Sequence, residues 1–255
     1  MFGFLFRHSP FETYTLITYY ASMAFQLVVF DIAGTTVTDQ QNVHDAFRGA
    51  FEKLAHPVTT PAVNHIMGYR KMEAIKMLLQ QFYPAQLNND LLIAAIHEQF
   101  ELDMQQFYRH TADLQPLPFA VATFRLLKAN NIKIGLDTGF TKSITDIIIN
   151  RLGWLKDGLI DVVVSSDEVK EGRPQPYMIW SMMEQLNLRD LKKVAKVGDT
   201  EVDILEGRNA GCGLVVSVTT GSYSKEELEE FTPDHIIASL QELPVLLGID
   251  QPLAV

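Results

Sequence analysis

The sequence has a single cysteine, fewer basic than acidic residues and no long hydrophobic run, and each shortage excludes a class of protein. Cys212 has no second cysteine with which to form a disulfide, so we expect a cytoplasmic protein in a reducing compartment. The 21 Lys and Arg residues against 31 Asp and Glu residues give a net charge of −10, which disfavours binding to a phosphate backbone. We therefore expect no nucleic-acid partner.

The apolar stretches near the start of the chain are short. Polar residues and Pro10 interrupt residues 1–25 before ~18 consecutive apolar residues, the length needed for a membrane helix, accumulate. We therefore predict no membrane span, and we interpret residues 1–22 as an N-terminal extension with Met23 as an alternative start. The length of 255 residues favours one large domain that carries a smaller inserted one.

Short apolar runs alternate with helix-length patterned segments over most of the chain. Each run is followed by a polar or glycine-containing loop, which is typical of buried parallel strands. The expected strands are residues 27–30, 132–136, 160–164, 194–197 and 214–218, and the expected helices are 119–129, 143–152, 177–186 and 202–209. This alternation predicts an α/β fold with a doubly wound parallel sheet and helices on both faces.

One segment, residues 42–114, contains helix signals only. The expected helices are 43–54, 61–67, 71–82 and 90–108. Because the segment directly follows the loop of the first strand, it is expected over the carboxyl edge of the sheet, where open α/β sheets bind ligands. We predict an all-helical cap domain at 42–114, inserted between the two parts of a core domain, 23–41 and 115–255.

Three acidic residues follow the predicted strands. Asp31 directly follows the first strand, Asp199 stands at the end of the fourth, and Asp203 lies one helical turn further on. Parallel strands end at one edge of a sheet, so these carboxylates are expected to converge there and to repel one another unless a cation joins them. Oxygen ligands of this kind indicate Mg²⁺.

The same edge carries groups suited to phosphate oxygens. Thr138 and Gly139 follow the second strand and offer a hydroxyl and a backbone amide freed by glycine. Arg173 follows the third strand, and Thr35 adds a hydroxyl in the loop after Asp31. Each residue alone is more typical of a turn or a helix cap, but their order on four strand ends favours a site for the phosphate group of a small molecule.

These residues, in this order from Asp31 to Asp203, resemble the four motifs of the haloacid dehalogenase superfamily. The resemblance implies a Rossmannoid core in which Asp31 is the nucleophile and binds Mg²⁺. It also implies that Asp199 is a metal ligand and that Asp203 supports both. Most phosphatases of this superfamily have, at the place of Ala33, an aspartate that protonates the leaving oxygen. The backbone carbonyl of Ala33 remains available to Mg²⁺, but acid catalysis typically worth ~10²–10⁴-fold is lost.

Ala33, and an arginine at 173 where lysine is usual, make the chain similar to the phosphonatase-like hydrolases, which act on phosphonoacetaldehyde. That family has a Met-Gly-x-x-Lys stretch whose lysine forms a Schiff base, and Met67 to Lys71 match its spacing. The resemblance implies that Lys71 is the imine-forming amine and that Met67 and Gly68 border the substrate. It also implies a possible homodimer joined through the caps.

The chemistry explains why Ala33 and Lys71 belong together. Breaking a carbon–phosphorus bond leaves a carbanion, which a carboxylic acid cannot rescue in time, whereas an iminium formed by Lys71 accepts the electrons as an enamine. The amine must be partly neutral to attack, and lowering its pKa from ~10.4 to ~7.5 costs about 4 kcal/mol. Burial under the cap and nearby cations are expected to lower it.

The chain also departs from the phosphonatase pattern. The family has a histidine three residues after the lysine, which takes part in proton transfer, whereas this chain has Ala74. Either Glu73 or water then replaces it, or the carbonyl substrate differs. Phe140 stands where a tyrosine is expected. The substrate is thus phosphonoacetaldehyde or another 2-oxoalkylphosphonate.

Two other functions are compatible with the motif order. The first is a phosphate monoesterase acting on phosphoglycolate or a sugar phosphate, against which Ala33 counts. The second is a non-catalytic protein that binds a phosphate ligand, against which the intact Asp31, Asp199 and Arg173 count.

Overall fold

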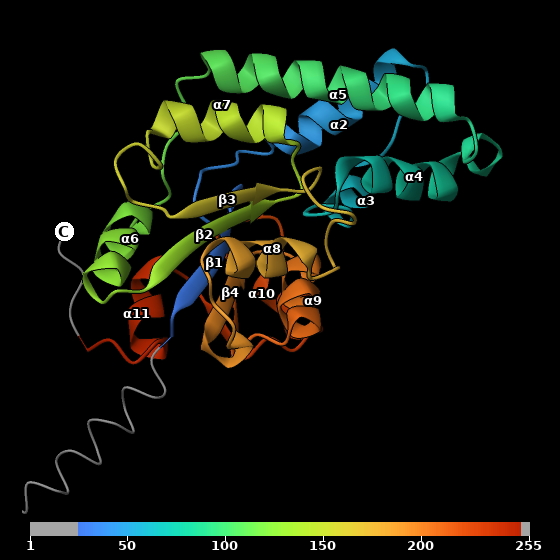
Figure 1. Cartoon of the computed structure of the whole chain (residues 1–255). Coiled ribbons are helices and arrows are strands. Elements are labelled where there is room, and N and C mark those ends of the chain that lie inside the picture. Colours follow the sequence, from blue (N-terminus) through green and yellow to red (C-terminus); the bar gives the residue numbers. More distant parts are fainter. Residues whose placement is uncertain (1–24, 251–255) are drawn as a thin grey trace, which may run out of the picture.

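A six-stranded parallel sheet forms the centre of the protein, whose computed structural model describes residues 25–250. The strand order is β3-β2-β1-β4-β5-β6 (Figure 1). The strands are β1 (Leu27–Asp31), β2 (Lys133–Thr138), β3 (Val162–Ser165), β4 (Val194–Gly198), β5 (Leu214–Val218) and β6 (His235–Ile237). The predicted doubly wound sheet and its five strands are confirmed, and β6 was outside the prediction because three residues give no usable pattern.

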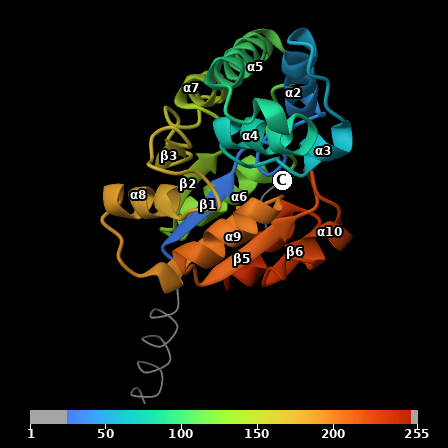
Figure 2. The ribbon, with the colours of Figure 1, turned by 90° about the vertical axis from the view of Figure 1, so that its right-hand side faces the viewer.

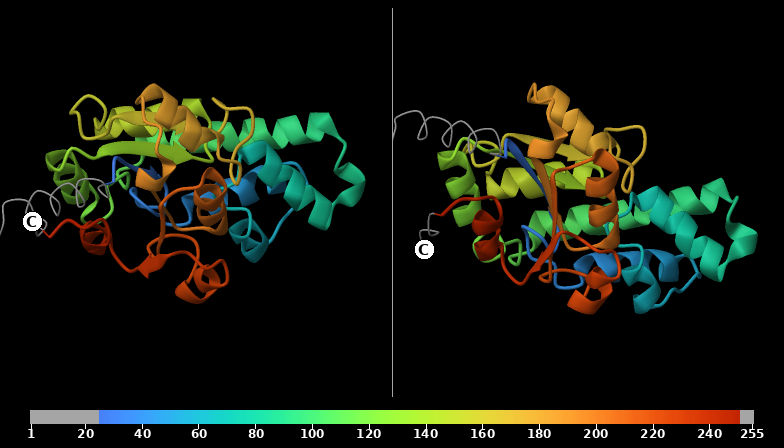
Figure 3. Two further views of the ribbon diagram at one scale, coloured as in Figure 1. Left: turned by 60° about the horizontal axis from the view of Figure 1, so that its bottom comes forward. Right: turned by 90° about the horizontal axis from the view of Figure 1, so that it is seen from below.

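Helices cover both faces of this sheet (Figure 3). Alternation along β1 sends Val28 and Phe30 into one apolar cluster and Leu27 and Val29 into another. The first cluster is covered by α6 (Ala120–Ala129), α7 (Lys142–Leu152) and α11 (Leu243–Leu246), with the short η3 (Leu240–Glu242). The second is covered by α8 (Tyr177–Gln185), α9 (Glu201–Ala210) and α10 (Lys225–Glu229), with η2 (Leu191–Lys193) nearby.

A purely helical insertion lies between β1 and α6 in the chain and beyond one end of the sheet in space (Figure 2). It consists of α2 (Asn42–Lys53), α3 (Thr60–Asn64), α4 (Lys71–Phe82), η1 (Pro84–Gln86) and α5 (Asp90–His110). Side-chain caps set two of the starts, since Thr59 accepts a hydrogen bond from the Ala62 amide and Asn89 from the Leu92 amide. The four helices predicted for this segment are therefore present, with α3 shorter than expected.

Polar contacts attach the long helix α5 to α7 beside it (Figure 1). Glu101 accepts hydrogen bonds from the hydroxyls of Thr141 and Ser143 at 2.7–2.8 Å. Arg151 donates to the carbonyl of Tyr108 at 2.6 Å, near the end of α5. These contacts hold the insertion against the loop after β2, where the site described below is formed.

Two sequence predictions concern the ends and the surface of the molecule. The proposed extension, residues 1–22, lies outside the described residues. Within residues 25–250, no helix combines the length and the apolar character needed to cross a bilayer.

Phe124 of α6 provides a test of the packing between helix and sheet. Its ring packs edge-on against Phe30 at 5.3 Å and Trp154 at 5.2 Å between centroids, and it is fully buried. Replacing it by alanine leaves a cavity, so Phe124→Ala is expected to lower the free energy of unfolding by ~3–5 kcal/mol in urea titrations. Leu91→Ala, at a site 85% exposed, is the control, and an equal effect of both changes would contradict the packing.

Candidate active site

A cavity at the carboxyl edge of the sheet brings residues of the sheet and of the helical insertion together. Asp31 ends β1, Thr138 ends β2, and Asp199 directly follows β4. The predicted residues that line the cavity are Asp31, Ala33, Met67, Gly68, Lys71, Thr138, Gly139, Asp199 and Asp203. Residues far apart in the sequence thus share one site, and the two remaining predicted residues, Thr35 and Arg173, lie behind its walls.

Arg173 is the centre of a buried network of charges. Its guanidinium is fully buried, with Nη1 2.7 Å from Asp31 and 3.0 Å from Asp203, and Nη2 paired with Asp137. Its Nε lies 3.2 Å from Glu206. These carboxylates outweigh the effect of burial and raise the pKa of Arg173. Because Asp31 is held by this cation, the side chain expected to be the nucleophile has a fixed orientation.

A second buried cation, Lys196, lies in the middle of β4. Its Nζ pairs with Asp137, and it lies 3.1 Å from Asp203 and 3.2 Å from Glu206. Burial raises the pKa of Asp137, but Arg173 and Lys196 outweigh it and hold this pKa below its usual value. Asp137 is therefore ionised and links the two cations.

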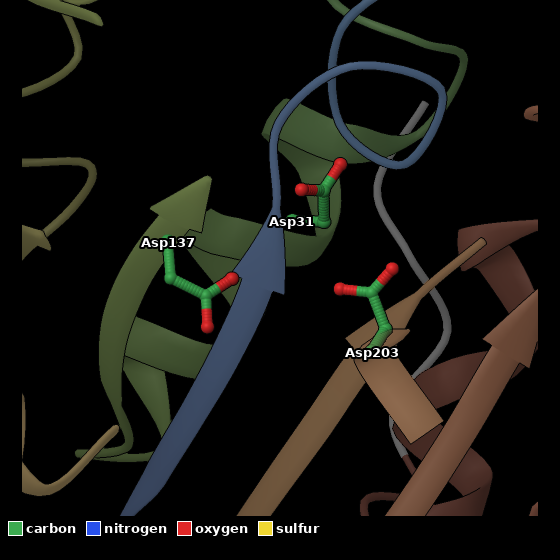
Figure 4. A group of neighbouring side chains, drawn as sticks. All are labelled: Asp31, Asp137 and Asp203. Atoms are coloured by element: carbon green, nitrogen blue, oxygen red, sulfur yellow. The ribbon is translucent and has the colours of Figure 1, made fainter. Parts of the chain in front are cut away.

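The three aspartates of this network lie around the end of β1 (Figure 4). Asp31, Asp137 and Asp203 each place one carboxylate oxygen within 4.8 Å of the others. Burial raises the pKa of Asp31 to about 6, and Arg173 opposes that rise. Three carboxylates at this distance could bind a metal ion. Here, however, each of them is already paired with Arg173, and Asp137 and Asp203 are paired with Lys196 as well.

Asp199 lies apart from this network. It is 1% exposed, and no ion pair of residues 25–250 includes it. The Thr35 hydroxyl donates to its Oδ1 at 2.9 Å, and the Ser222 amide donates to its Oδ2 at 2.7 Å. Burial, with Asp31 and Asp203 as neighbouring charges, raises the pKa of Asp199 well above its usual value.

Asp31 and Asp199 both line the catalytic cavity, and their carboxylates could hold a divalent cation there. Together with the network, Asp199 makes five carboxylates that face only two cations, and burial raises the pKa of both Asp199 and Glu206 well above the usual value. A further cation would favour the ionised form of these carboxylates. Asp199 is the carboxylate without a cationic partner among the described residues, and Ala33 lines the same cavity. This oxygen set suits a hard cation such as Mg²⁺.

Lys71 enters the cavity from the first turn of α4. It is 3% exposed, and three aromatic rings surround its Nζ: Phe140 at 4.9 Å, Phe47 at 5.5 Å and Phe100 at 5.8 Å to the centroids. Burial lowers the pKa of Lys71 to about 8, with Arg173 adding to the effect and Asp31 opposing it. The amine is therefore partly neutral near pH 8, as nucleophilic attack requires.

Glycines allow the insertion to lie directly against the core beside Lys71. A Cβ at Gly139 would lie 2.5–2.6 Å from the carbonyl oxygens of Tyr69 and Gly68. A Cβ at Gly68, where φ is +81°, would lie 2.6 Å from the Thr200 hydroxyl. Both positions therefore require glycine, and the cavity beside them has a volume of ≈ 20 Å³, room for about one water molecule.

Several residues of the site were outside the sequence prediction. Lys196 lies within an apolar run that was read only as a buried strand. A lysine at the centre of a buried strand must have carboxylate partners, and this is the signal that could have identified it. Asp137 and Glu206 give no such signal, since an acid beside a turn or on a helix is usually solvated. Phe47 and Phe100 reach Lys71 from separate helices, and their spacing in the sequence does not reveal this.

The chain belongs to the haloacid dehalogenase-like hydrolases, whose family model matches residues 25–211. Among curated relatives, a phosphonoacetaldehyde hydrolase of Latilactobacillus sakei subsp. sakei is 31% identical, over 88% of this chain and 95% of that protein. A phosphonoacetaldehyde hydrolase of Bacillus thuringiensis subsp. konkukian is 29% identical, over 83% of each chain. The expected resemblance to phosphonatase-like hydrolases is thereby confirmed.

Solved structures share the fold at lower sequence identity. A phosphonoacetaldehyde hydrolase-like protein from Oleispira antarctica superposes with a TM-score of 0.76 at 21% identity, over 88% of this chain and 92% of that one. A putative phosphoglycolate phosphatase from Lactobacillus delbrueckii subsp. bulgaricus gives 0.72 at 17%, over 88% and 99%. One of these neighbours is named for phosphonoacetaldehyde hydrolysis and the other for phosphoglycolate ester hydrolysis. The shared fold therefore does not distinguish between these two reactions.

The buried network predicts that loss of Lys196 is costly. Lys196→Met leaves Arg173 as the only cation among four carboxylates, so we expect the free energy of unfolding to fall by ~3–5 kcal/mol. Denaturant titration at pH 7 measures this. Lys192→Met, at an exposed position nearby, is the matched control and should change stability by less than ~0.5 kcal/mol. Wild-type stability of the Lys196 variant would show that the network does not need its second cation.

Proposed function

We propose that this protein hydrolyses the carbon–phosphorus bond of phosphonoacetaldehyde or a related 2-oxoalkylphosphonate, through a Schiff base on Lys71 and an aspartyl-phosphate on Asp31. The observation that carries the proposal is the buried amine of Lys71, facing the same cavity as Asp31. A buried lysine with a lowered pKa is costly to maintain, and a nucleophilic role explains it. The curated phosphonoacetaldehyde hydrolases among its relatives support the same chemistry.

In the first stage Lys71 activates the substrate. Its neutral amine forms a bond to the carbonyl carbon, and the resulting carbinolamine takes up a proton and loses water to leave an iminium. The rings of Phe47, Phe100 and Phe140 help to bury the amine, and this desolvation lowers the pKa of Lys71 although ring faces attract an ammonium. The iminium accepts the electrons of the carbon–phosphorus bond when that bond breaks. The reaction therefore needs no acid at position 33, where Ala33 has no proton to donate.

In the second stage Asp31 accepts the phosphoryl group. A carboxylate oxygen bonds to phosphorus as the carbon–phosphorus bond breaks, and the bonding electrons pass into the enamine on Lys71. Arg173, 2.7 Å from Asp31, keeps the carboxylate ionised and oriented. Thr138 and Gly139 line the cavity where the phosphonate oxygens would bind, and direct contact of Arg173 or Thr35 with them stays a prediction.

In the last stage water attacks the phosphorus and releases phosphate from Asp31. The enamine takes up a proton on carbon, and hydrolysis of the resulting iminium frees the aldehyde or ketone and restores Lys71. Asp31, Asp199 and the carbonyl of Ala33 would hold Mg²⁺, with Asp203 behind them. When bound, Mg²⁺ would neutralise charge on the phosphoryl oxygens.

We further propose that residues 42–114 act as a cap that opens to admit the substrate. The cavity of ≈ 20 Å³ is too small for a phosphonate. Contacts of Gly139 with Gly68 and Tyr69 join the insertion to the core at the site, so they must separate when the substrate enters. Closure would then bring Lys71 to the carbonyl carbon and exclude water.

The alternative function is hydrolysis of a phosphate ester, because one solved structure with this fold is a putative phosphoglycolate phosphatase. An ester needs an acid for its leaving oxygen, and Ala33 provides none. It also needs no buried amine, so Lys71 would have no role. A protein that only binds a phosphate ligand would leave both Asp31 and Lys71 without a function.

Replacing the amine tests the proposal directly. Lys71→Met keeps an apolar side chain among the three rings, and we expect phosphate release from phosphonoacetaldehyde to fall by more than ~10³-fold because the covalent catalyst is lost. Lys76→Met, at an exposed position of the same helix, should keep wild-type rates. If the wild type cleaves only phosphate esters, and Lys71→Met cleaves them equally well, the ester alternative holds instead.

The lowered pKa of Lys71 predicts a pH dependence. Because the pKa falls from 10.5 to about 8, the neutral amine is the minor form below pH 8 and the major form above it. The rate at low substrate concentration is therefore expected to rise nearly tenfold per pH unit up to about pH 8 and then to level off. Initial rates in constant-ionic-strength buffers measure this. A rise that continues to about pH 10.5 would mean that Lys71 is an ordinary solvated lysine.

A further inference from the structure

A second cavity, of ≈ 320 Å³, adjoins the catalytic cavity where the helical insertion begins. Its walls include Asp39 in the segment after β1, His44 of α2 and Asn64 of α3. Ser222 lines this cavity and the catalytic cavity alike, so the two are neighbours. Its volume accommodates several water molecules, and its walls provide polar partners for them.

His44 lines this cavity and has a basic nitrogen that makes no hydrogen bond. The side chain is 6% exposed, and its Nε2 lies 3.1 Å from the amide oxygen of Asn64. An amide oxygen only accepts hydrogen bonds, so Nε2 carries the hydrogen and Nδ1 keeps a lone pair. Nδ1 is buried and has no hydrogen-bond partner among the residues described. Asn64 thus holds His44 in the tautomer that can accept a proton at Nδ1.

The same helix connects His44 to the surroundings of Lys71. Val43 lines the catalytic cavity, and the ring of Phe47, one helical turn after His44, lies 5.5 Å from the Lys71 Nζ. The carboxyl of Asp39 interacts electrostatically with both His44 and Lys71, and its own pKa is raised by burial. The cavity that His44, Asp39 and Ser222 line therefore adjoins the cavity that contains the amine.

Other groups near Lys71 are less suited to carry its protons. Glu73 stands two positions after Lys71, so the two side chains point to different sides of α4. Glu101 already accepts hydrogen bonds from Thr141 and Ser143. His97 interacts electrostatically with Lys71, but it lines neither of the two cavities.

We propose that His44 transfers protons for imine formation at Lys71, through water in the second cavity. This inference rests on the proposed Schiff-base function. As the amine nitrogen bonds to the carbonyl carbon, Nδ1 of His44 takes the proton that the nitrogen loses. It returns this proton to the oxyanion, which gives the neutral carbinolamine. One further proton, taken up from solvent water, converts the carbinolamine hydroxyl into water, which leaves as the iminium forms. His44 ends in its starting state. It thereby takes the part of the histidine that the phosphonatase pattern has where this chain has Ala74.

The experiment measures the rate at which borohydride traps phosphonoacetaldehyde on Lys71 in rapid-quench samples of the full-length protein. For His44→Ala we expect this rate to fall by ~10²-fold, the usual scale of acid–base catalysis, and to recover in part when imidazole is added. His44→Gln fills the same space without a basic nitrogen, so it should lose the rate and show no recovery. His97→Ala is the matched control and should trap at the wild-type rate.

The outcomes separate the two proposals. No adduct with the wild type overturns the Schiff-base function and the role of His44 with it. A wild-type adduct that forms equally fast in folded His44→Ala or His44→Gln overturns the role of His44 alone, as does a loss confined to His97→Ala. A slowed rate that imidazole does not restore in His44→Ala, with a lowered unfolding midpoint, assigns His44 a structural role instead.

Discussion

The structure depends on the pairing of Arg173 and Lys196 with the carboxylates at the end of the sheet. Asp31 and Asp137 come from neighbouring strands and Asp203 and Glu206 from α9, and without buried cations these acids would repel one another. The network therefore joins β1, β2, β4 and α9 at the point where the nucleophile must stand. Asp199 remains outside it, and this leaves one carboxylate free to share a metal with Asp31.

A second constraint places an amine opposite this acidic cluster. Lys71 belongs to the insertion, and its aromatic surroundings come from α2, from α5 and from the loop after β2. The amine is therefore desolvated where insertion and core meet, at a contact that the glycines at 68 and 139 permit.

The sequence predicted the parts of the protein that rest on local pattern. Buried strands such as 194–197 are continuous apolar runs, and their order placed Asp31, Thr138 and Asp199 at one edge. It did not predict what depends on contacts between distant segments. The partners of Lys196 and the ring of Phe100 beside Lys71 come from packing of separate elements, and the cavity at His44 forms where the insertion begins.

The central claim is that Lys71 forms a covalent bond to the carbon of its substrate. Incubation with phosphonoacetaldehyde and borohydride, followed by proteolysis and mass mapping of the peptides, tests it most directly. The account predicts a reduced two-carbon adduct on the peptide that contains Lys71, with none on the peptide of Lys76. Turnover of the phosphonate without any label on Lys71 would contradict it.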